Sequence, residues 1–164
     1  MTEFRVGQGL DVHAYAERAD RRLVLGGVRI PGEPGLAGHS DADVVLHALV
    51  DALLGATGGG DLGLLFGSSE PEYADADSQV FLAGALGHLA EGAWRVNNVD
   101  LTIVGERPRI GPYRTAIAGS VAGLLGVDRT LVNVKATSTD RLGFLGRAEG
   151  LACLAVVLVQ RDVG

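Results

Sequence analysis

Apolar and polar residues alternate along residues 4–15, FRVGQGLDVHAY, and this pattern predicts a strand. Side chains two positions apart on a strand point to the same face, so Asp11 and His13 are expected to lie together. Residues 21–35, RRLVLGGVRIPGEPG, predict two short strands that meet at Gly26 and Gly27, followed by a loop rich in proline and glycine. The first part of the chain is therefore expected to be extended.

The period of the apolar positions changes to that of a helix from Ser40 onward. Ser40 or Asp41 can serve as the N-cap of a helix that runs to about Ala56. Residues 57–76, TGGGDLGLLFGSSEPEYADA, are rich in glycine, serine and acidic residues, which predicts a long loop. Long ordered loops often carry function.

Helical and strand patterns both occur in the second half of the chain. Asp77 and Ser78 offer a cap for a second helix that ends near Leu89, and a third helix fits residues 113–125, closed by Gly126. Runs of apolar and β-branched residues predict three strands, at residues 94–104, 131–138 and 150–160. The last two strands are expected to follow each other without a helix between them.

Together these elements predict an α+β fold in a single domain spanning residues 1–164. The expected architecture is a mixed sheet of about four main strands with helices packed on one face. The other face of such a sheet must also be buried. Self-association of the chain would bury it.

The composition is that of a folded globule, because 47% of the 164 residues are hydrophobic and 21% are charged. A net charge of -6 disfavours nucleic acid as a partner, since binding a phosphate backbone requires clustered lysine and arginine. A small phosphorylated ligand is compatible with this charge, because a pocket needs only a few cations and backbone N–H groups.

Cys153 is the only cysteine, so no internal disulfide can form, and it is expected to be a buried thiol in the apolar run LACLAVVLV. The opening residues MTEFRVGQGL lack the pattern of a signal peptide, and no apolar run is long enough to span a membrane. A cytoplasmic location without a membrane partner is therefore expected. His88, near a predicted helix end, is assigned no role.

Asp11 and His13 form a D-x-H pair whose side chains could reach one metal ion. By itself the pair is a weak signal, and an exposed loop end with a hydrogen-bonded histidine is the simpler interpretation. A second group comes from HSDADVVLH, where Asp43, His47 and Asp51 repeat every four residues along one helical face. A solvated polar face is the alternative interpretation of that stripe.

His47 favours a metal site over a solvated face. Its neighbours Leu46, Ala48 and Leu49 are apolar, which suggests that His47 faces the core or a cleft. Two imidazoles and one carboxylate are typical of a zinc site with an open fourth position, whereas structural zinc usually has four cysteine and histidine ligands. A chain with one cysteine favours the catalytic kind of site.

A third candidate region is NVKATSTDRLGFLGRAEG, residues 133–150. Thr137, Ser138 and Thr139 can donate hydrogen bonds to phosphate oxygens, and Asp140 can supply an oxygen ligand for a cation such as Mg²⁺. An ordinary strand-to-turn junction explains the same composition equally well. Both interpretations stay open on this segment alone.

The segments that carry these features resemble the 2-C-methyl-D-erythritol 2,4-cyclodiphosphate synthases of the non-mevalonate isoprenoid pathway. The resemblance covers nearly the whole chain and rests on GQGLDVHAY, LVLGGVRIP, HSDADVVLHALVDALLGA, GDLGLLF, NVDLTIV, RPRIGP and NVKATSTDRLGFLGRAEG, in that order. It implies a phosphorus–oxygen lyase acting on 4-diphosphocytidyl-2-C-methyl-D-erythritol 2-phosphate. The 2-phosphate of this substrate attacks its own β-phosphate, which closes a cyclic diphosphate and releases CMP.

The resemblance also implies two metal sites. Asp11, His13 and His47 are expected to hold Zn²⁺ or another divalent cation, with a substrate phosphate as fourth ligand. Asp140 is expected to hold a second cation, Mg²⁺ or Mn²⁺. Because the metals and the substrate carry the chemistry, no nucleophile from the protein is required.

Substrate contacts are implied by the same matching positions. His39 and Ser40 are expected to bind the erythritol phosphate, and Asp61 and Gly63 the erythritol hydroxyls, with Phe66 lining that pocket.

Two further sets of residues follow from the resemblance. Asp43 and Asp51 are expected to support the metal ligands, and an acid four residues from His47 could orient its imidazole. Ser138 is also taken as a catalytic position. The nucleotide is expected to lie along Gly105, Pro108, Arg109, Ala136, Thr137 and Ser138.

Members of the family are homotrimers with active sites at subunit interfaces, so a homotrimer is implied here. Its axial cavity would accept an isoprenoid diphosphate near Phe144, Arg147 and Glu149. Two positions depart from the family pattern. Asp140 stands where glutamate is common, which leaves the preferred second metal open, and residues 67–70 differ, so Ser68 is given no role.

Two rival functions remain from the sequence. One is a zinc-dependent nucleotide phosphohydrolase that uses water as the nucleophile. The other is a non-catalytic trimeric protein that binds isoprenoid diphosphates, which the complete Asp11, His13 and His47 set disfavours.

Overall fold

The computed structural model describes residues 1–18, 20–67, 71–73 and 75–164. Its main sheet consists of four strands, β1 (Thr2–Ala14), β4 (Arg95–Val104), β5 (Val132–Thr137) and β6 (Gly150–Asp162). Their order is β1-β6-β4-β5, with β4 and β5 parallel and the other neighbours antiparallel. A hairpin of β2 (Arg22–Leu25) and β3 (Val28–Pro34) forms a separate two-stranded sheet. The predicted α+β fold with a mixed four-stranded sheet is confirmed.

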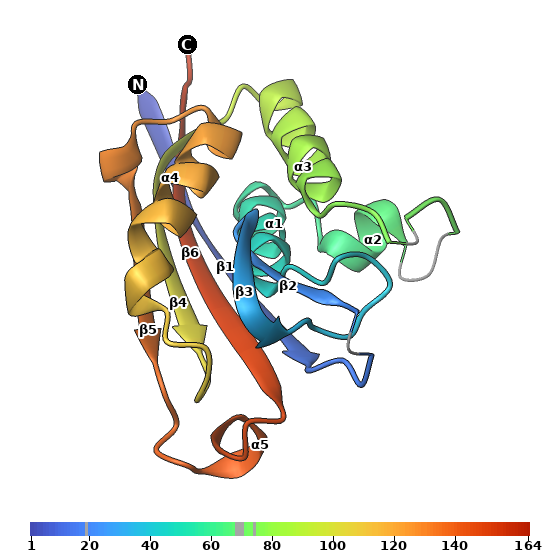
Figure 1. Ribbon diagram of the computed structural model, residues 1–164. Coiled ribbons are helices and arrows are strands. Elements are labelled where there is room, and N and C mark those ends of the chain that lie inside the picture. The colour runs from blue at the N-terminus through green and yellow to red at the C-terminus, as the bar shows by residue number, and fades with distance from the viewer. Residues whose placement is uncertain (19, 68–70, 74) are drawn as a thin grey trace.

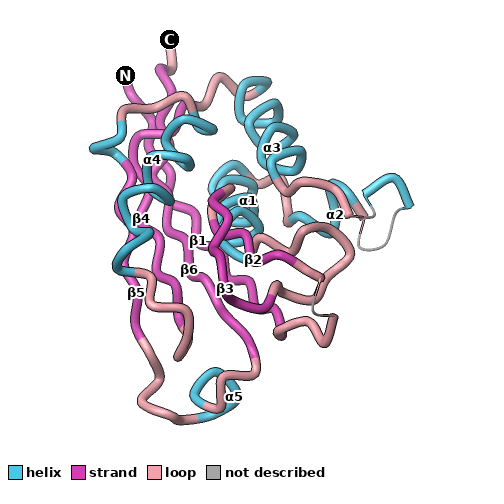
Figure 2. The backbone as a smooth tube through the Cα atoms, in the orientation of Figure 1, coloured by secondary structure: helices cyan, strands magenta, loops and turns pink. Residues whose placement is uncertain are grey.

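The helices are α1 (Val44–Thr57), α2 (Leu62–Phe66), α3 (Gln79–Glu91), α4 (Arg114–Leu125) and α5 (Gly143–Gly146). Figure 1 shows α1 and α4 on the same side of the main sheet, with the β2–β3 hairpin passing over α1. Figure 2 shows the two chain ends side by side, as the pairing of Thr2 with Asp162 requires. No helix of the described segments is both long and apolar enough to cross a membrane.

Helix α1 lies unusually close to the edge strand β1, and two glycines allow it. A Cβ atom at Gly7 or at Gly9 would lie only 1.9 Å from a carbonyl oxygen of α1, that of Ala52 or of Ala48. One face of β1 is turned towards α1, and it carries Gly7, Gly9, Asp11 and His13. The close approach therefore brings the end of α1 that carries His47 next to Asp11.

Helix α1 is buried all round rather than on one face. Ten of its residues are buried, from Val44 to Ala56. The sheet covers one side, and the hairpin covers another with the buried residues Leu23, Leu25 and Ile30. The alternative of a solvated polar stripe on this helix is wrong, because Asp43 is fully buried and His47 lies in a partly enclosed cavity.

The face of the sheet away from the helices carries exposed apolar side chains on its β1 and β6 strands. The large ones are Phe4, Val6, Leu10, Val12 and Val156, which are 54%, 68%, 57%, 42% and 42% exposed. On β4 and β5 the same face is polar, with Asn133 donating a hydrogen bond to Asp100 at 2.8 Å. Only the half of this face formed by β1 and β6 therefore has apolar side chains that would be expected to be buried by another chain.

Two expected boundaries are wrong. Helix α1 begins at Val44 rather than after Ser40 or Asp41, because the Asp43 carboxylate accepts hydrogen bonds from the N–H groups of Val45 and Leu46. The expected loop 57–76 contains helix α2, which begins where Asp61 accepts a hydrogen bond from the N–H of Leu64.

Other expectations stand or need a small correction. Ser78 precedes α3, and Gly126 closes α4 in the left-handed conformation, as predicted. The short helix α5 lies between β5 and β6, where no helix was expected. Cys153 is fully buried, and burial raises the pKa of its thiol. Ser68 lies outside the described residues.

Candidate metal centre

Strand β1 and helix α1 bring Asp11, His13 and His47 together, as the sequence predicted. Asp11 and His13 are near the end of β1, paired across the sheet with Cys153 and Leu151 of β6. His47 is in the first turn of α1. All three side chains are mostly shielded from solvent, with exposed fractions of 24%, 19% and 12%.

The three potential ligand atoms form a compact triangle. Asp11 Oδ2 lies 2.9 Å from His13 Nε2 and 3.1 Å from His47 Nδ1, and the two nitrogens are 3.2 Å apart. In a tetrahedral zinc site with bonds of about 2.0 Å, two ligand atoms are separated by about 3.3 Å. The donor types and spacing therefore fit a divalent cation such as Zn²⁺, and this is the one such group of three among the described residues.

His13 is held in the orientation that a metal ligand needs. Its Nδ1 lies 2.6 Å from the carbonyl oxygen of Ala37, which can only accept a hydrogen bond. The Nδ1 hydrogen is therefore donated to Ala37, and in the neutral ring Nε2 is left with a lone pair directed at the centre of the triangle. A backbone carbonyl behind a liganding histidine is a common way to set its tautomer.

The charges of the triangle are coupled. Burial opposes ionisation of Asp11, but hydrogen bonds and attraction from the charged forms of His13 and His47 hold its pKa below the usual range for a carboxyl. Burial also opposes the charged form of His13, and the adjacent Asp11 outweighs it and raises the pKa of that imidazole. The site thus favours a negative carboxylate with positive charge beside it, as a bound cation would supply.

A cavity of about 230 Å³ opens beside these three residues. His39, Ser40 and Gly63 line it, so these expected substrate contacts lie where a ligand of the metal would sit. Four further lining residues were not foreseen, namely Leu62, Gly67, Tyr73 and Phe81.

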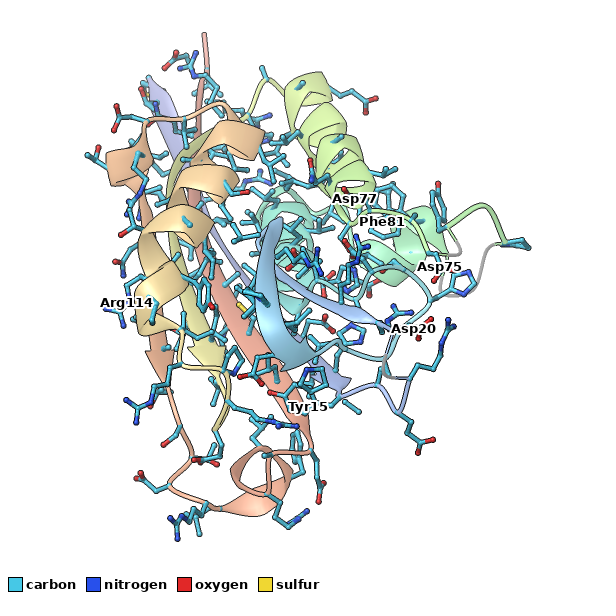
Figure 3. The ribbon with its side chains drawn as sticks, viewed as in Figure 1. Tyr15, Asp20, Asp75, Asp77, Phe81 and Arg114 are labelled. Atoms are coloured by element: carbon cyan, nitrogen blue, oxygen red, sulfur yellow. The ribbon has the colours of Figure 1, made fainter. Side chains whose placement is uncertain are left out.

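One wall of the cavity is formed by an aromatic cluster. Phe81 lies in the first turns of α3 (Figure 3), with its ring 5.8 Å from that of His47. Phe66 packs edge-on against Phe81 and Tyr73, with ring centres 5.1 and 5.9 Å away. Phe66 therefore supports the pocket through these two rings, whereas Asp61 is exposed at the start of α2.

The expected support of His47 by Asp43 or Asp51 does not take the form predicted. Asp43 accepts hydrogen bonds from the N–H groups of Gly26 and Gly27 at 2.8 and 2.7 Å, in addition to capping α1. Asp51 accepts one from the N–H of Leu62 at 2.8 Å. Four residues on a helix bring side chains close, but these carboxylates are already engaged in fixing the hairpin and α2.

A second cavity, of about 210 Å³, lies where β4 and β5 end. It is lined by residues that the sequence assigned to nucleotide binding: Gly105, Pro108, Arg109, Ala136, Thr137 and Ser138. None of the described residues lines both this cavity and the one beside the metal ligands.

Tyr15 connects the two regions. It follows the end of β1 (Figure 3), and its hydroxyl donates a hydrogen bond to the carbonyl of Arg107 in the loop of the second cavity. The guanidinium of Arg107 lies over the Tyr15 ring, 4.9 Å from its centre. Burial raises the pKa of Tyr15 to about 12, so the hydroxyl keeps its hydrogen for this bond.

Asp140, Phe144 and Arg147 do not line the cavity beside the metal ligands. Asp140 is exposed, and its backbone N–H donates to the Ser138 hydroxyl at 3.3 Å. Phe144 is 47% exposed on α5, and Arg147 pairs with Glu149 at 2.6 Å. A second cation site at Asp140 stays a prediction, as does a role for the residues of α5.

A carboxylate and two imidazoles that could hold one metal ion, beside a cavity, are the ligand set typical of catalytic metal sites. The model of the YgbB family matches residues 4–160, and the chain belongs to this family. This match, together with relatives about half identical to the chain, confirms the resemblance predicted from the sequence motifs.

Relatives in several organisms are named 2-C-methyl-D-erythritol 2,4-cyclodiphosphate synthase. The one from Thiobacillus denitrificans is 52% identical over 98% of this chain and 99% of its own length. The one from Rubrobacter xylanophilus is 50% identical over 100% of this chain and 99% of its own length.

Solved structures agree with this relationship. The bifunctional IspDF from Campylobacter jejuni has a TM-score of 0.93 and 37% identity over 99% of this chain, which spans 43% of that longer protein. IspF from Plasmodium falciparum, solved as a CDP complex, has a TM-score of 0.85 and 30% identity, covering 98% of this chain and 97% of that one.

Proposed function

We propose that the chain converts 4-diphosphocytidyl-2-C-methyl-D-erythritol 2-phosphate into 2-C-methyl-D-erythritol 2,4-cyclodiphosphate and CMP, a lyase reaction of isoprenoid biosynthesis. The Asp11, His13 and His47 triangle beside an open cavity is the observation that supports it most directly, in a chain about half identical to proteins of that name. We propose that it acts as one domain, residues 1–164, in the cytoplasm.

The reaction needs no nucleophile from the protein. An oxygen of the 2-phosphate forms a bond to the β-phosphorus, and the bond from that phosphorus to the oxygen bridging the α-phosphate breaks, so the α-phosphate leaves in CMP. A divalent cation held by Asp11, His13 and His47 would polarise a phosphoryl oxygen and offset its charge. The task of the protein is therefore to hold two phosphates of one molecule in line.

The lining residues suit this task. His39 and Ser40 would bind the erythritol phosphate in the cavity beside the metal ligands, and Gly63 would let the backbone approach the erythritol. The hydroxyl and backbone donors of Thr137 and Ser138 would hold the nucleotide part, with Asp140 offering an oxygen to a second cation, Mg²⁺ or Mn²⁺. The CDP complex of the Plasmodium falciparum relative supports a cytidine nucleotide as ligand.

Phosphorus NMR of the product tests the proposal. Incubation of the purified chain with the proposed substrate should yield CMP and a cyclic diphosphate, and a metal chelator should abolish the reaction. A linear phosphorylated product would support the rival nucleotide phosphohydrolase. Binding without turnover would support the non-catalytic alternative.

We further propose that the chain assembles as a homotrimer through the exposed apolar half of the sheet, because Phe4, Val6, Leu10 and Val12 lie on one face of β1, where Gln8 is the one polar residue among them. Two cavities without a common lining residue also suit an active site completed by a neighbouring subunit. An isoprenoid diphosphate would bind near Phe144 of α5 and Arg147, which follows it, at the end of the sheet opposite the chain termini (Figure 1).

Sedimentation analysis tests the assembly. The unaltered chain should sediment with the mass of three chains, and Val6→Glu should dissociate it. Val80→Glu serves as the control, since Val80 is comparably exposed at 50% but lies on α3. A monomeric parent chain, or equal effects of the two substitutions, would refute the proposed interface.

A further inference from the structure

Ser78 is a buried serine at the start of α3 whose side chain does not cap that helix. It is 0% exposed, and its hydroxyl makes no hydrogen bond to the N–H groups of the first turn. The neighbouring Asp77, which Figure 3 labels at the same end of α3, accepts a hydrogen bond from the Gln79 N–H instead. The Ser78 hydroxyl is thus free of the usual role of a serine in this position and is turned towards His47.

Asp41 determines where the hydroxyl hydrogen of Ser78 goes. Asp41 Oδ1 accepts a hydrogen bond from the Ser78 hydroxyl, and Asp41 Oδ2 accepts one from the Ser78 backbone N–H at 3.2 Å. A hydroxyl has a single hydrogen to donate and lone pairs to accept with. With that hydrogen committed to Asp41, Ser78 Oγ can only accept from its other neighbours.

The nearer of its other neighbours is His47 Nε2, 2.9 Å away, whereas Ser40 Oγ lies at 3.5 Å. Since Ser78 Oγ accepts there, Nε2 must carry the hydrogen, and in the neutral ring Nδ1 is then left with the lone pair. Nδ1 is the atom that lies 3.1 Å from Asp11 Oδ2 and 3.2 Å from His13 Nε2. Ser40 Oγ is a weaker second acceptor, at 3.3 Å from the same Nε2.

We propose that Ser78, held by Asp41, is a positioning residue that fixes His47 in the tautomer and ring orientation required of a metal ligand. The three side chains come from three places, the segment before α1, the start of α3 and α1 itself. A hydroxyl held by a carboxylate takes the place of the carboxylate or carbonyl found behind liganding histidines elsewhere. His13 has the Ala37 carbonyl in the same role, so both imidazoles of the site are oriented from behind.

The inference rests on the metal site of the proposed function, but its first test does not. In the metal-free protein at mildly alkaline pH, two-bond nitrogen–proton NMR of labelled histidine reports the tautomer of each neutral ring. His47 should appear as the Nε2–H form in the unaltered chain. The Nδ1–H form, or a mixture, would overturn the proposal whether or not any variant folds.

Ser78→Ala removes the acceptor while leaving the liganding atoms in place. It should mix the His47 tautomers and weaken metal binding, measured by chelator competition, by about 10–100-fold, the usual effect of losing a group behind a ligand. Ser78→Thr keeps the hydroxyl and should restore both. Ser120→Ala, the same change on α4, should alter neither.

The outcomes separate this inference from the proposed function. Absence of cyclic product with an Nε2–H ring at His47 would refute the reaction and leave the role of Ser78 standing. Cyclic product from Ser78→Ala with unchanged metal affinity and tautomer would refute the role of Ser78 and leave the reaction standing.

Discussion

Replacement of Gly9 by alanine should disable the metal centre from a position that contacts no ligand. The added Cβ would lie 1.9 Å from the Ala48 carbonyl oxygen and 2.8 Å from the Ala52 nitrogen, whereas an ordinary contact begins at 3.4 Å. Both neighbours are backbone atoms of α1 and cannot rotate away. The helix must therefore move from β1 by about 1.5 Å, the difference between 3.4 and 1.9 Å.

This displacement is large compared with the tolerance of a metal site. Ligand distances at a metal site normally stay within about 0.2 Å of their preferred values. A shift of α1 by about 1.5 Å would move His47 away from Asp11 and His13 by far more than this tolerance, so tight metal binding should be abolished. Overpacking should also cost about 1–3 kcal/mol of stability. For a chain of this size, that corresponds to a fall in Tm of about 2–12 °C.

Gly55→Ala is the matched control. Gly55 is exposed on α1, and a Cβ there meets only the Gln8 carbonyl oxygen at 3.9 Å. Alanine should favour the helix by up to about 1 kcal/mol and leave metal binding intact. Metal stoichiometry by atomic absorption and Tm by calorimetry check both variants. If Gly9→Ala bound metal as tightly as the parent chain, the close contact of β1 and α1 would not be what sets the site.

Three further predictions concern the pH dependence of metal affinity, the pH dependence of stability, and the second cation. Metal affinity, followed by chelator competition, should rise with pH by up to about tenfold per unit until the raised pKa of His13 is passed and then level off, because the proton on that imidazole competes with the metal. In the metal-free protein, the raised pKa of His13 adds stability at pH values below the pKa of an unfolded histidine, and this stability is lost as the pH rises through the pKa of His13 in the folded protein. Thermal melts over a pH series measure it, and a contribution that increased with pH over this range would contradict the pairing of His13 with Asp11. Asp140→Ala should abolish the stimulation of turnover by Mg²⁺ while leaving the first metal bound, and unchanged Mg²⁺ dependence in a titration would remove Asp140 from the site.

The position of the three potential metal ligands could be predicted from the sequence, because the periodicity of a strand and the apolar neighbours of a helical residue show which way these side chains face. Asp11 and His13 share a face of β1 as a strand requires, and the apolar neighbours of His47 indicated its inward position. The helix start was placed wrongly because HSDAD holds three candidate caps close together. The choice of Asp43 depends on Gly26 and Gly27, whose N–H groups bind the same carboxylate from a distant part of the chain.

The parts that escaped prediction depend on contacts between distant segments. LGLLF is too short to show a helical period, so α2 was taken as loop. Tyr73, from the segment between α2 and α3, lines the cavity beside Phe81 of α3, with the two ring centres 5.2 Å apart. Ser78 reads as an ordinary helix cap, and nothing in its neighbourhood indicates a contact with His47, 31 residues earlier.

The most direct test of the account is a zinc titration of the chelated protein with turnover measured at each step. Activity should return in proportion to added Zn²⁺ and reach its maximum at one ion per chain for the Asp11, His13 and His47 site, with the second cation kept saturating throughout. His47→Ala should neither retain the ion nor recover activity. Full turnover in the chelated protein, or retention of one tightly bound ion by a folded His47→Ala chain, would contradict the central claim.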